Sequence, residues 1–327
     1  MKRLLLMQAL GEEGVDGCGR DGSAPGSRAG WLTSQTPGCR AATHNAYPMA
    51  HFSYDGHRLA YTVYGEGERV TVLIPGLLLS QKMQAPLARS LAGAGHRVVT
   101  FDPLGHGDSD RPRQMWRYSM PEFARQTVAL LDHLGLEQAV VGGTSLGANV
   151  TLEVAAAAPD RLRGMVIEMP VLDNAIPACG AAFTPLLFAL TFGEPGMRAL
   201  ARVARAVPRR VPFLLELFLD WISQDPGPSG AVLQGILFGR TAPEHRVRES
   251  IRTPALVIGH PRDPVHPFSD AGMLAAELPN GRLVNASSII ELRANPRRLT
   301  REIAAFLDEV WAARAAGRGR AARAAGG

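Results

Sequence analysis

The sequence predicts an α/β protein built on a doubly wound parallel sheet, on the strength of two recurring patterns. Short apolar runs that stop at Pro or Gly recur along the chain, and runs of this length are typical of strands buried on both faces of a parallel sheet. Amphipathic helical stretches lie between these runs. Alternation of strand and helix in this way is typical of doubly wound folds.

The predicted strands begin near Met49, where the stretch "MAHFSYDGHRLAYTVYG" first alternates apolar and polar residues. The runs that follow are 58–65 (RLAYTVYG), 70–76 (VTVLIPG), 97–103 (RVVTFDP), 139–143 (AVVGG), 164–170 (GMVIEMP) and 254–260 (PALVIGH). One helical stripe lies between Pro121 and Gly135 and is formed by Phe123, Thr127, Leu130, Leu131 and Leu134. A second stripe near the end is formed by Leu299, Ile303, Phe306, Leu307 and Val310. Both stripes are interpreted as core packing.

These patterns divide the chain into a core, an insertion and two ends. We predict a core over 49–170 and 251–313, interrupted by a helical cap over 171–250 in which helical segments are punctuated by Pro and Gly. Residues 1–48 lack periodicity and are expected to be a disordered leader or an artefact of start-codon assignment, and residues 314–327 are expected to be a disordered basic tail. The aromatic residues of the cap suit either an apolar ligand or core packing: Phe183, Phe188, Phe192, Phe213, Phe218 and Trp221.

Composition narrows the classes of function. The chain has 327 residues, 46% of them apolar, which is enough for a sizeable core. The formal net charge of +5 lies mainly in the arginines of the 314–327 tail, so it gives little support for a nucleic-acid surface. No apolar run approaches the ~20 residues that span a bilayer, and no membrane partner is expected. The cysteines lack metal-ligand spacing, which favours a cytoplasmic protein without a disulfide framework: Cys18, Cys39 and Cys179.

The clearest chemical motif is Gly-Thr-Ser-Leu-Gly at residues 143–147. It follows a predicted strand and opens an alanine-rich helical stretch, which is the context that a G-x-S-x-G nucleophile elbow requires. The glycines suit a strained turn with close backbone neighbours. The helix that begins at Leu146 directs free N–H groups toward developing negative charge. We therefore predict that Ser145 is a nucleophile.

With this motif the chain resembles the α/β-hydrolase fold superfamily from about residue 49 to residue 311. The loop "DPLGHGDSDRP" at 102–112 matches the family's D-x-x-G-x-G-x-S-x-x-P pattern, and the resemblance implies that His106 packs in it rather than catalyses. An eight-stranded, mostly parallel sheet with an inserted helical cap is also implied. In "LIPGLLLS" (73–80), Pro75 replaces the family's His before a retained Gly. By resemblance, the backbone N–H groups of Leu77 and Leu146 form the oxyanion hole.

The resemblance also places the catalytic acid after the seventh strand. The stretch "ALVIGHPRDPVHP" (255–267) supplies Asp263, followed by Pro267 as in the family's D-x-x-x-P pattern. Asp263 could instead be a residue of a surface turn or of a helix N-terminus. Glu168, at the end of the sixth strand, and Asp173 are alternative acids.

The base departs from the family pattern. Members carry a His about seven residues before a Pro near the end of the chain, and counting back from Pro296 gives Ile289 at that position. The sequence contains no His after His266. His260 and His266 flank the predicted acid, and either replaces the missing base if its ring reaches the Ser145 hydroxyl within hydrogen-bond distance. The alternative is that both are pocket-wall or loop-packing residues.

We therefore predict a hydrolase that cleaves the acyl bond of a small apolar carboxylic ester, thioester or lactone. Ser145 is the nucleophile, Asp263 the acid and His266 or His260 the base. Two alternatives stay open: a catalytically impaired, hydrolase-like small-molecule binding protein, and a lyase or isomerase that uses the oxyanion hole. Epoxide hydrolases and haloalkane dehalogenases are disfavoured because Ser, not Asp, occupies the elbow. No metal or cofactor is implied.

Overall fold

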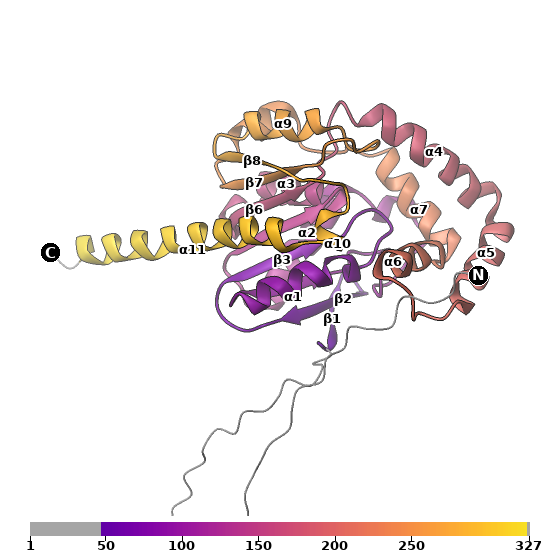
Figure 1. The fold of residues 1–327 in the computed structure, drawn as a ribbon, viewed down its shortest axis with the longest axis horizontal. Coiled ribbons are helices and arrows are strands. Elements are labelled where there is room, and N and C mark those ends of the chain that lie inside the picture. The colour runs from indigo at the N-terminus through magenta and orange to yellow at the C-terminus, as the bar shows by residue number, and fades with distance from the viewer. Residues whose placement is uncertain (1–46, 326–327) are drawn as a thin grey trace, which may run out of the picture. The chain divides into compact units, whose positions relative to one another are not determined.

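The strands form one eight-stranded sheet in the order β1-β2-β4-β3-β5-β6-β7-β8 (Figure 1). The computed structural model describes residues 47–325, and after residue 312 it describes the backbone alone. The strands are β1 (Met49–Tyr54), β2 (His57–Tyr64), β3 (Val70–Ile74), β4 (Arg97–Phe101), β5 (Ala139–Thr144), β6 (Leu162–Glu168), β7 (Ala255–Gly259) and β8 (Gly281–Asn285). β2 runs antiparallel to both of its neighbours, and the other pairs are parallel. This is the predicted fold class.

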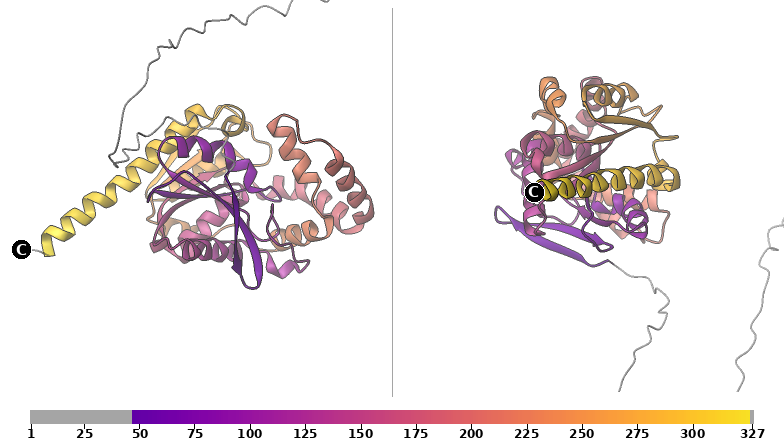
Figure 2. Two further views of the ribbon diagram at one scale, coloured as in Figure 1. Left: turned by 90° about the horizontal axis from the view of Figure 1, so that it is seen from below. Right: turned by 90° about the vertical axis from the view of Figure 1, so that its left-hand side faces the viewer.

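Helices cover both faces of the sheet (Figure 2). On one face lie α1 (Ala85–Gly93) and α11 (Arg297–Ala325), and on the other lie α2 (Met120–His133), α3 (Leu146–Ala157) and α9 (Phe268–Glu277). Strands β3, β5 and β7 are buried along their whole length, which explains their continuous apolar sequences. Their successive side chains alternate between the two faces, so each strand contributes to both cores.

The helix predicted between Pro121 and Gly135 is α2. Its N-cap is Ser119, whose hydroxyl accepts the backbone N–H of Glu122 at 3.3 Å. The helix ends just before Gly135, which has a φ of 64° and so turns the chain toward β5. The shorter helical elements of the core are η1 (Gln81–Gln84), η2 (Met115–Arg117), η3 (Pro159–Arg161) and α10 (Glu291–Ala294).

The insertion between β6 and β7 is helical, as predicted. It contains α4 (Ile176–Phe192), α5 (Glu194–Ala206), α6 (Phe213–Ile222) and α7 (Pro226–Leu237), which lie beyond the carboxyl ends of the parallel strands (Figure 1). We call these four helices the cap. Helix α8 (His245–Ser250) returns to the core, where Arg248 forms a buried ion pair with Glu277 of α9 at 2.6 Å.

No single helix within residues 47–325 is both long and apolar enough to cross a membrane. Helices α4 and α5 pass that test only as a pair, and their axes are bent by 100° at the break between them.

The structure describes the C-terminal end of the chain but almost none of the N-terminal end. The expected leader, residues 1–48, lies outside the described residues except for positions 47 and 48. The tail expected to be disordered from residue 314 instead continues as helix α11 through Ala325. The physical reason is composition, because Ala and Arg are among the strongest helix formers and dominate this segment.

Candidate active site

Ser145 occupies a strained turn between β5 and α3. Its backbone has a φ of 55° and a ψ of −110°, a conformation that non-glycine residues rarely adopt. The glycines on either side allow the turn, since a Cβ on Gly143 would lie 2.6 Å from the backbone of Gly147, and one on Gly147 would lie 2.4 Å from the carbonyl oxygen of Ile74. The Ser145 N–H donates to the carbonyl oxygen of Glu168 on β6 at 2.9 Å. The side chain is thereby held out at the carboxyl edge of the sheet.

The imidazole that reaches Ser145 belongs to His266. Its Nε2 lies 2.8 Å from Ser145 Oγ, and its Nδ1 lies 3.0 Å from a carboxylate oxygen of Asp263. An ionised carboxylate can only accept, so Nδ1 carries the hydrogen and Nε2 of the neutral ring is the acceptor for the serine hydroxyl. The structure therefore brings three predicted residues, Ser145, Asp263 and His266, into one hydrogen-bonded chain.

The turn after β7 orients the acid and the imidazole together. Asp263 Oδ1 accepts the backbone N–H groups of Val265 and His266, each at 2.9 Å, while its Oδ2 binds the imidazole. Burial alone would raise the pKa of Asp263, but the hydrogen bonds from the His266 ring and from these N–H groups outweigh it and lower the pKa. The carboxylate thus remains charged while it fixes both the turn and the ring.

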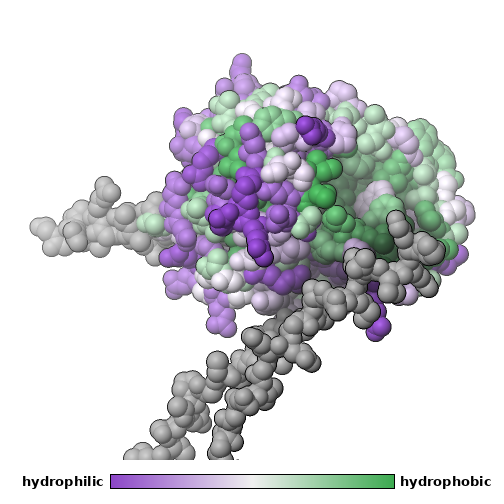
Figure 3. Space-filling model, in the orientation of Figure 1, coloured by the Kyte–Doolittle hydropathy of each residue, from purple (hydrophilic) through white to green (hydrophobic). Residues whose placement is uncertain are grey.

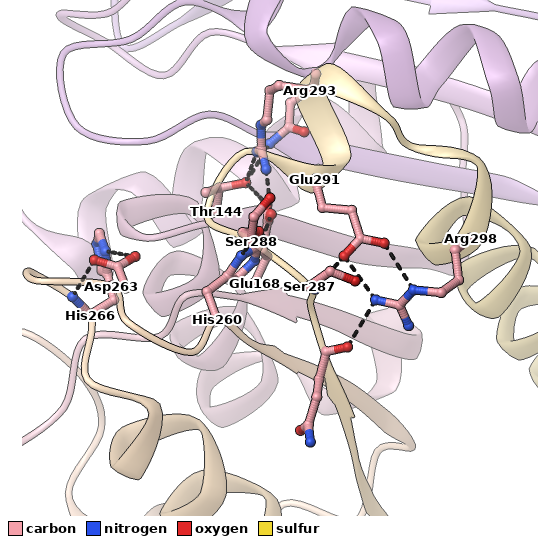
Figure 4. Close-up of polar contacts among 12 residues, drawn as sticks. Thr144, Glu168, His260, Asp263, His266, Ser287, Ser288, Glu291, Arg293 and Arg298 are labelled. Atoms are coloured by element: carbon pink, nitrogen blue, oxygen red, sulfur yellow. Dashed lines mark hydrogen bonds and ion pairs between the residues drawn. The ribbon is translucent and has the colours of Figure 1, made fainter.

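His260, the alternative base, lies elsewhere. Its Nδ1 is 2.8 Å from the carbonyl oxygen of Ser288 and its Nε2 is 3.1 Å from a carboxylate oxygen of Glu168 (Figure 4). Its side chain is fully buried, and both ring nitrogens are engaged. His260 is therefore a packing and hydrogen-bonding residue in this structure, and the contact to Ser145 comes from His266.

Behind the elbow lies a buried polar cluster that the sequence did not reveal. Arg293 of α10 donates to a carboxylate oxygen of Glu168 and, at 2.6 Å, to Thr144 Oγ1, and the Thr144 hydroxyl donates to Glu168 in turn (Figure 4). Gln84 Nε2 also approaches Thr144 Oγ1 at 3.0 Å. Arg293 and Glu168 lie 125 positions apart, so spacing along the chain gives no signal of their pairing.

The cluster shows what Glu168, one of the two alternative catalytic acids, does in the structure. Burial would raise the pKa of Glu168, but the charge of Arg293 and the hydrogen bonds from His260 and Arg293 lower it to about 2. Glu168 is thus a charged partner of Arg293 and does not reach His266. Asp173, the other alternative, is exposed to solvent.

Ile289, at the position where the family histidine was expected, follows the last strand as a half-exposed side chain, 42% accessible. The carbonyl oxygen of its neighbour Ser288 faces His260. The region after β8 therefore contributes the Arg293 ion pair to the cluster behind the elbow, while the imidazole next to Ser145 comes from the turn after β7.

The residues predicted to form the oxyanion hole, Leu77 and Leu146, line the same cavity as Ser145. Leu146 is the first residue of α3, so its N–H is one of those that have no acceptor within the helix. Leu77 follows Gly76, which lies against the β5–α3 turn: a Cβ on Gly76 would be 3.7 Å from the Thr144 carbonyl oxygen. The positive end of α3 and the β3 loop thus meet at Ser145.

The cavity in front of Ser145 is apolar and has a volume of about 450 Å³. Helices α4 and α7 supply most of its wall, which includes Ile176, Cys179, Gly180, Phe183, Thr184, Leu187, Phe188, Ile236 and Leu237. Met120 and Val171 close it on the core side. Of the cap aromatic residues singled out in the sequence, Phe183 and Phe188 line this cavity, whereas Trp221 lines a separate, smaller one.

His106 packs inside the 102–112 loop, as expected. Its ring meets Phe123 edge-on, with the ring centres 5.5 Å apart, and its Nδ1 lies 3.1 Å from the Leu104 carbonyl oxygen. Burial lowers the pKa of His106 to about 4. The loop is held by Asp102, which accepts the N–H of Gln81 at 2.6 Å. These contacts indicate a structural role.

Comparison with known proteins agrees with this architecture. Residues 70–181 match the family model described as "alpha/beta hydrolase fold". The chain is 32% identical over 149 residues to "Bifunctional epoxide hydrolase 2" of Sus scrofa, covering 43% of this chain and 26% of that protein. It is 36% identical over 124 residues to "Serine hydrolase BPHL" of Mus musculus, covering 37% and 43%. The matches thus span less than half the length of these curated relatives.

Solved structures show the same fold over most of the chain. The enol-lactonase from Burkholderia xenovorans superposes with a TM-score of 0.66 at 21% identity, covering 79% of this chain and 100% of that one. A thermophilic esterase from Thermogutta terrifontis superposes with a TM-score of 0.62 at 20% identity, covering 80% and 99%.

Proposed function

We propose that the chain is a serine hydrolase that cleaves the acyl bond of a small apolar ester, thioester or lactone. The match of residues 70–181 to the alpha/beta hydrolase family model and the fold shared with the enol-lactonase support this proposal. The observation that carries the proposal is the 2.8 Å contact between His266 Nε2 and Ser145 Oγ. A hydroxyl is a weak nucleophile until a base accepts its proton, and this contact supplies the base.

The proposed reaction begins with attack of Ser145 Oγ on the acyl carbon while His266 Nε2 takes the hydroxyl proton. Asp263 stabilises the imidazolium that forms. The negative charge that develops on the acyl oxygen is stabilised by the N–H groups of Leu77 and Leu146. The bond to the leaving alcohol or thiol then breaks, and His266 returns its proton to that group.

Water completes the cycle. It attacks the acyl carbon of the acyl-enzyme, gives one proton to His266 and releases the carboxylic acid as Ser145 Oγ recovers that proton. The apolar wall from α4 and α7 suits the hydrocarbon part of the acyl group. The elbow residue also separates this reaction from the one named for the epoxide hydrolase relatives, since we expect that chemistry to use Asp where this chain has Ser145.

Labelling with a fluorophosphonate tests the proposal, because the reagent reacts only with an activated serine. We expect the wild-type protein to be labelled, the Ser145→Ala variant to lose the label, and His266→Ala to be labelled far more slowly. Ser53→Ala, which alters an exposed serine of β1, is the matched control and keeps the label.

Absence of labelling at high reagent concentration would contradict the proposal. In that case, thermal stabilisation by apolar carboxylic esters without product formation would identify a binding protein. Labelling together with failure to hydrolyse any activated ester would favour a lyase or isomerase that uses the oxyanion hole.

A further inference from the structure

The cap exposes an unusual amount of apolar side chain. Helix α4 has 17 residues, none of them charged, and Leu190 is its one buried residue. Large apolar side chains also lie exposed on α5 and α6. The exposed set on the three helices is Ile176, Phe188, Phe192, Leu200, Val203, Leu214, Leu215 and Phe218. We call this set the cap patch. So many large exposed apolar side chains on three neighbouring helices indicate a binding surface rather than ordinary scatter.

A basic segment lies beside the cap patch. Helix α5 and the turn after it carry Arg198, Arg202, Arg205, Arg209 and Arg210. Two of the neighbouring acids are engaged, since Glu194 binds Arg113 and Arg198 and Asp220 binds Lys82 and Arg209, and Glu216 of α6 is the third acid nearby. Within residues 47–325, Arg202 and Arg210 have no ion-pair partner, and both are exposed. The surface therefore combines hydrocarbon with an excess of positive charge, since five arginines in residues 193–222 stand against three acids.

The mouth of the active-site cavity opens within the same surface. Ile176 and Phe188 belong both to the cavity wall and to the cap patch, with 51% and 57% of their surface exposed. Phe238, just after α7, lines the cavity as well and is 75% exposed. Figure 3 shows apolar residues gathered over the cap around a hollow in the surface. Hydrocarbon thus continues from the outer face of the cap into the cavity.

We propose that the cap docks on an anionic lipid surface through the cap patch and the α5 arginines. Helices with an apolar face and arginines beside it lie in the plane of a membrane, where the apolar side chains enter the lipid and the cations meet anionic headgroups. A second copy of the chain is a poorer fit, because a two-fold interface through this face would bring the same arginines together. The expectation of no membrane partner rested on bilayer-spanning length, which interfacial docking does not need.

Docking of this kind gives the cavity a direct route to substrate. With the cap patch on lipid, the mouth beside Phe188 faces the hydrocarbon, so an apolar acyl substrate can enter without crossing water. This consequence rests on the proposed function, whereas the docking itself does not. The two are separable, because the Ser145→Ala variant removes the nucleophile and leaves the cap patch unchanged.

Flotation with large unilamellar vesicles tests the docking. We expect the full chain to float with vesicles that contain phosphatidylglycerol and phosphatidylcholine, to bind pure phosphatidylcholine more weakly, and to lose binding as salt rises. Phe192→Ser should lower the partition coefficient roughly tenfold through lost apolar burial. Arg202→Gln should lower it about fivefold on the anionic vesicles alone. Ser145→Ala should bind as the wild type does.

The matched controls lie away from the cap: Leu283→Ser alters a partly exposed apolar residue on β8, and Arg301→Gln alters an exposed arginine on α11. Both are expected to float like the wild type. The docking proposal is overturned if no vesicle composition captures the chain, or if the cap variants and the controls bind equally. It is also overturned if the chain forms a stable dimer that Phe192→Ser dissociates while vesicles capture nothing.

Discussion

His266 Nε2 lies 2.8 Å from Ser145 Oγ, although the two residues are separated by 121 positions in the chain. Ser145 follows β5 and His266 follows β7, with β6 between them in the sheet. The carboxyl ends of parallel strands meet at one edge, so the two side chains converge. The ring that contacts the hydroxyl therefore comes from the loop that also carries the acid.

The first prediction concerns His266 and Asp263, the two residues that form a hydrogen-bonded chain with Ser145. Replacing His266 with Ala removes the proposed proton acceptor and should lower kcat for an activated ester by about 10⁴- to 10⁶-fold. Asp263→Asn should lower it by roughly 10⁴-fold, because the ring loses the carboxylate that sets its tautomer. Steady-state hydrolysis of a chromogenic ester measures both. His57→Ala, on β2, is the control and should keep wild-type kcat, and a His266→Ala enzyme with normal kcat would exclude the proposed base.

A second prediction uses Ile289. If the region after β8 still supported a base, the double variant His266→Ala/Ile289→His would regain activity. We expect it to remain as inactive as His266→Ala, because the side chain of Ile289 is half-exposed and the adjacent Ser288 carbonyl is held by His260. Recovery of more than about a hundredfold in kcat would show that the loop can deliver a histidine to Ser145.

The third prediction concerns the size of the acyl group. Gly180 lies on the cavity wall, and a Cβ there would meet no atom within 4 Å. Gly180→Leu should therefore reduce the volume of the cavity, raise KM more for esters of longer acyl chains than for acetyl esters, and leave the fold intact. Gly196→Leu on α5 is the matched control, since its Cβ is equally free and lies outside the cavity. Equal effects of the two substitutions on chain-length preference would contradict the assignment of the cavity.

The fourth prediction concerns the buried ion pair between Arg293 and Glu168, whose side chains are 7% and 4% exposed. Arg293→Met leaves the carboxylate buried without its main partner and should lower the free energy of unfolding by about 3–5 kcal/mol. Arg69→Met breaks an exposed pair with Asp308 and should lower it by about 1 kcal/mol or less. Urea denaturation of both variants measures the difference. Equal losses of unfolding free energy would contradict the prediction that the buried pair stabilises the fold more than the exposed one.

The fifth prediction concerns acid stability. The pKa of Glu168 is lowered from its ordinary value of 4.5 to about 2 in the folded protein. A carboxyl group with a lowered pKa contributes stability above its unfolded pKa and loses it as pH falls toward the folded value. Unfolding free energy should thus fall between about pH 4.5 and 2, and Glu168→Gln should make that fall shallower while lowering stability at pH 7. Urea denaturation at several pH values measures this dependence. If the unfolding free energy of Glu168→Gln falls with pH as steeply as that of the wild type, the assignment to Glu168 is wrong.

Much of the fold could be predicted from the sequence because local patterns carry it. Fully buried strands such as β3 and β7 appear as uninterrupted apolar runs, and α2 appears as an apolar stripe between Pro121 and Gly135. The 314–325 segment was the exception, since a short arginine-rich run of Ala and Gly suggested disorder whereas its Ala and Arg content favours helix.

The site was less predictable because its contacts are distant in sequence. The G-x-S-x-G turn identifies Ser145 locally, but the choice between His260 and His266 depends on which ring faces the hydroxyl. Only the three-dimensional path of the 260–267 loop decides it. The Arg293 pair was missed for the same reason, because nothing near Arg293 in the sequence points to a carboxylate on β6.

Because Asp263 and His266 lie in one short turn, a movement of that turn would affect the site in a particular way. Because a single carboxylate holds both the turn and the ring, a displacement of this loop would carry the two away together as an intact unit. The contact between His266 and Ser145 would then be lost while the hydrogen bond between Asp263 and His266 stayed intact. Under the proposed function, an inactive form would thus differ from the active one mainly in the distance from His266 Nε2 to Ser145 Oγ.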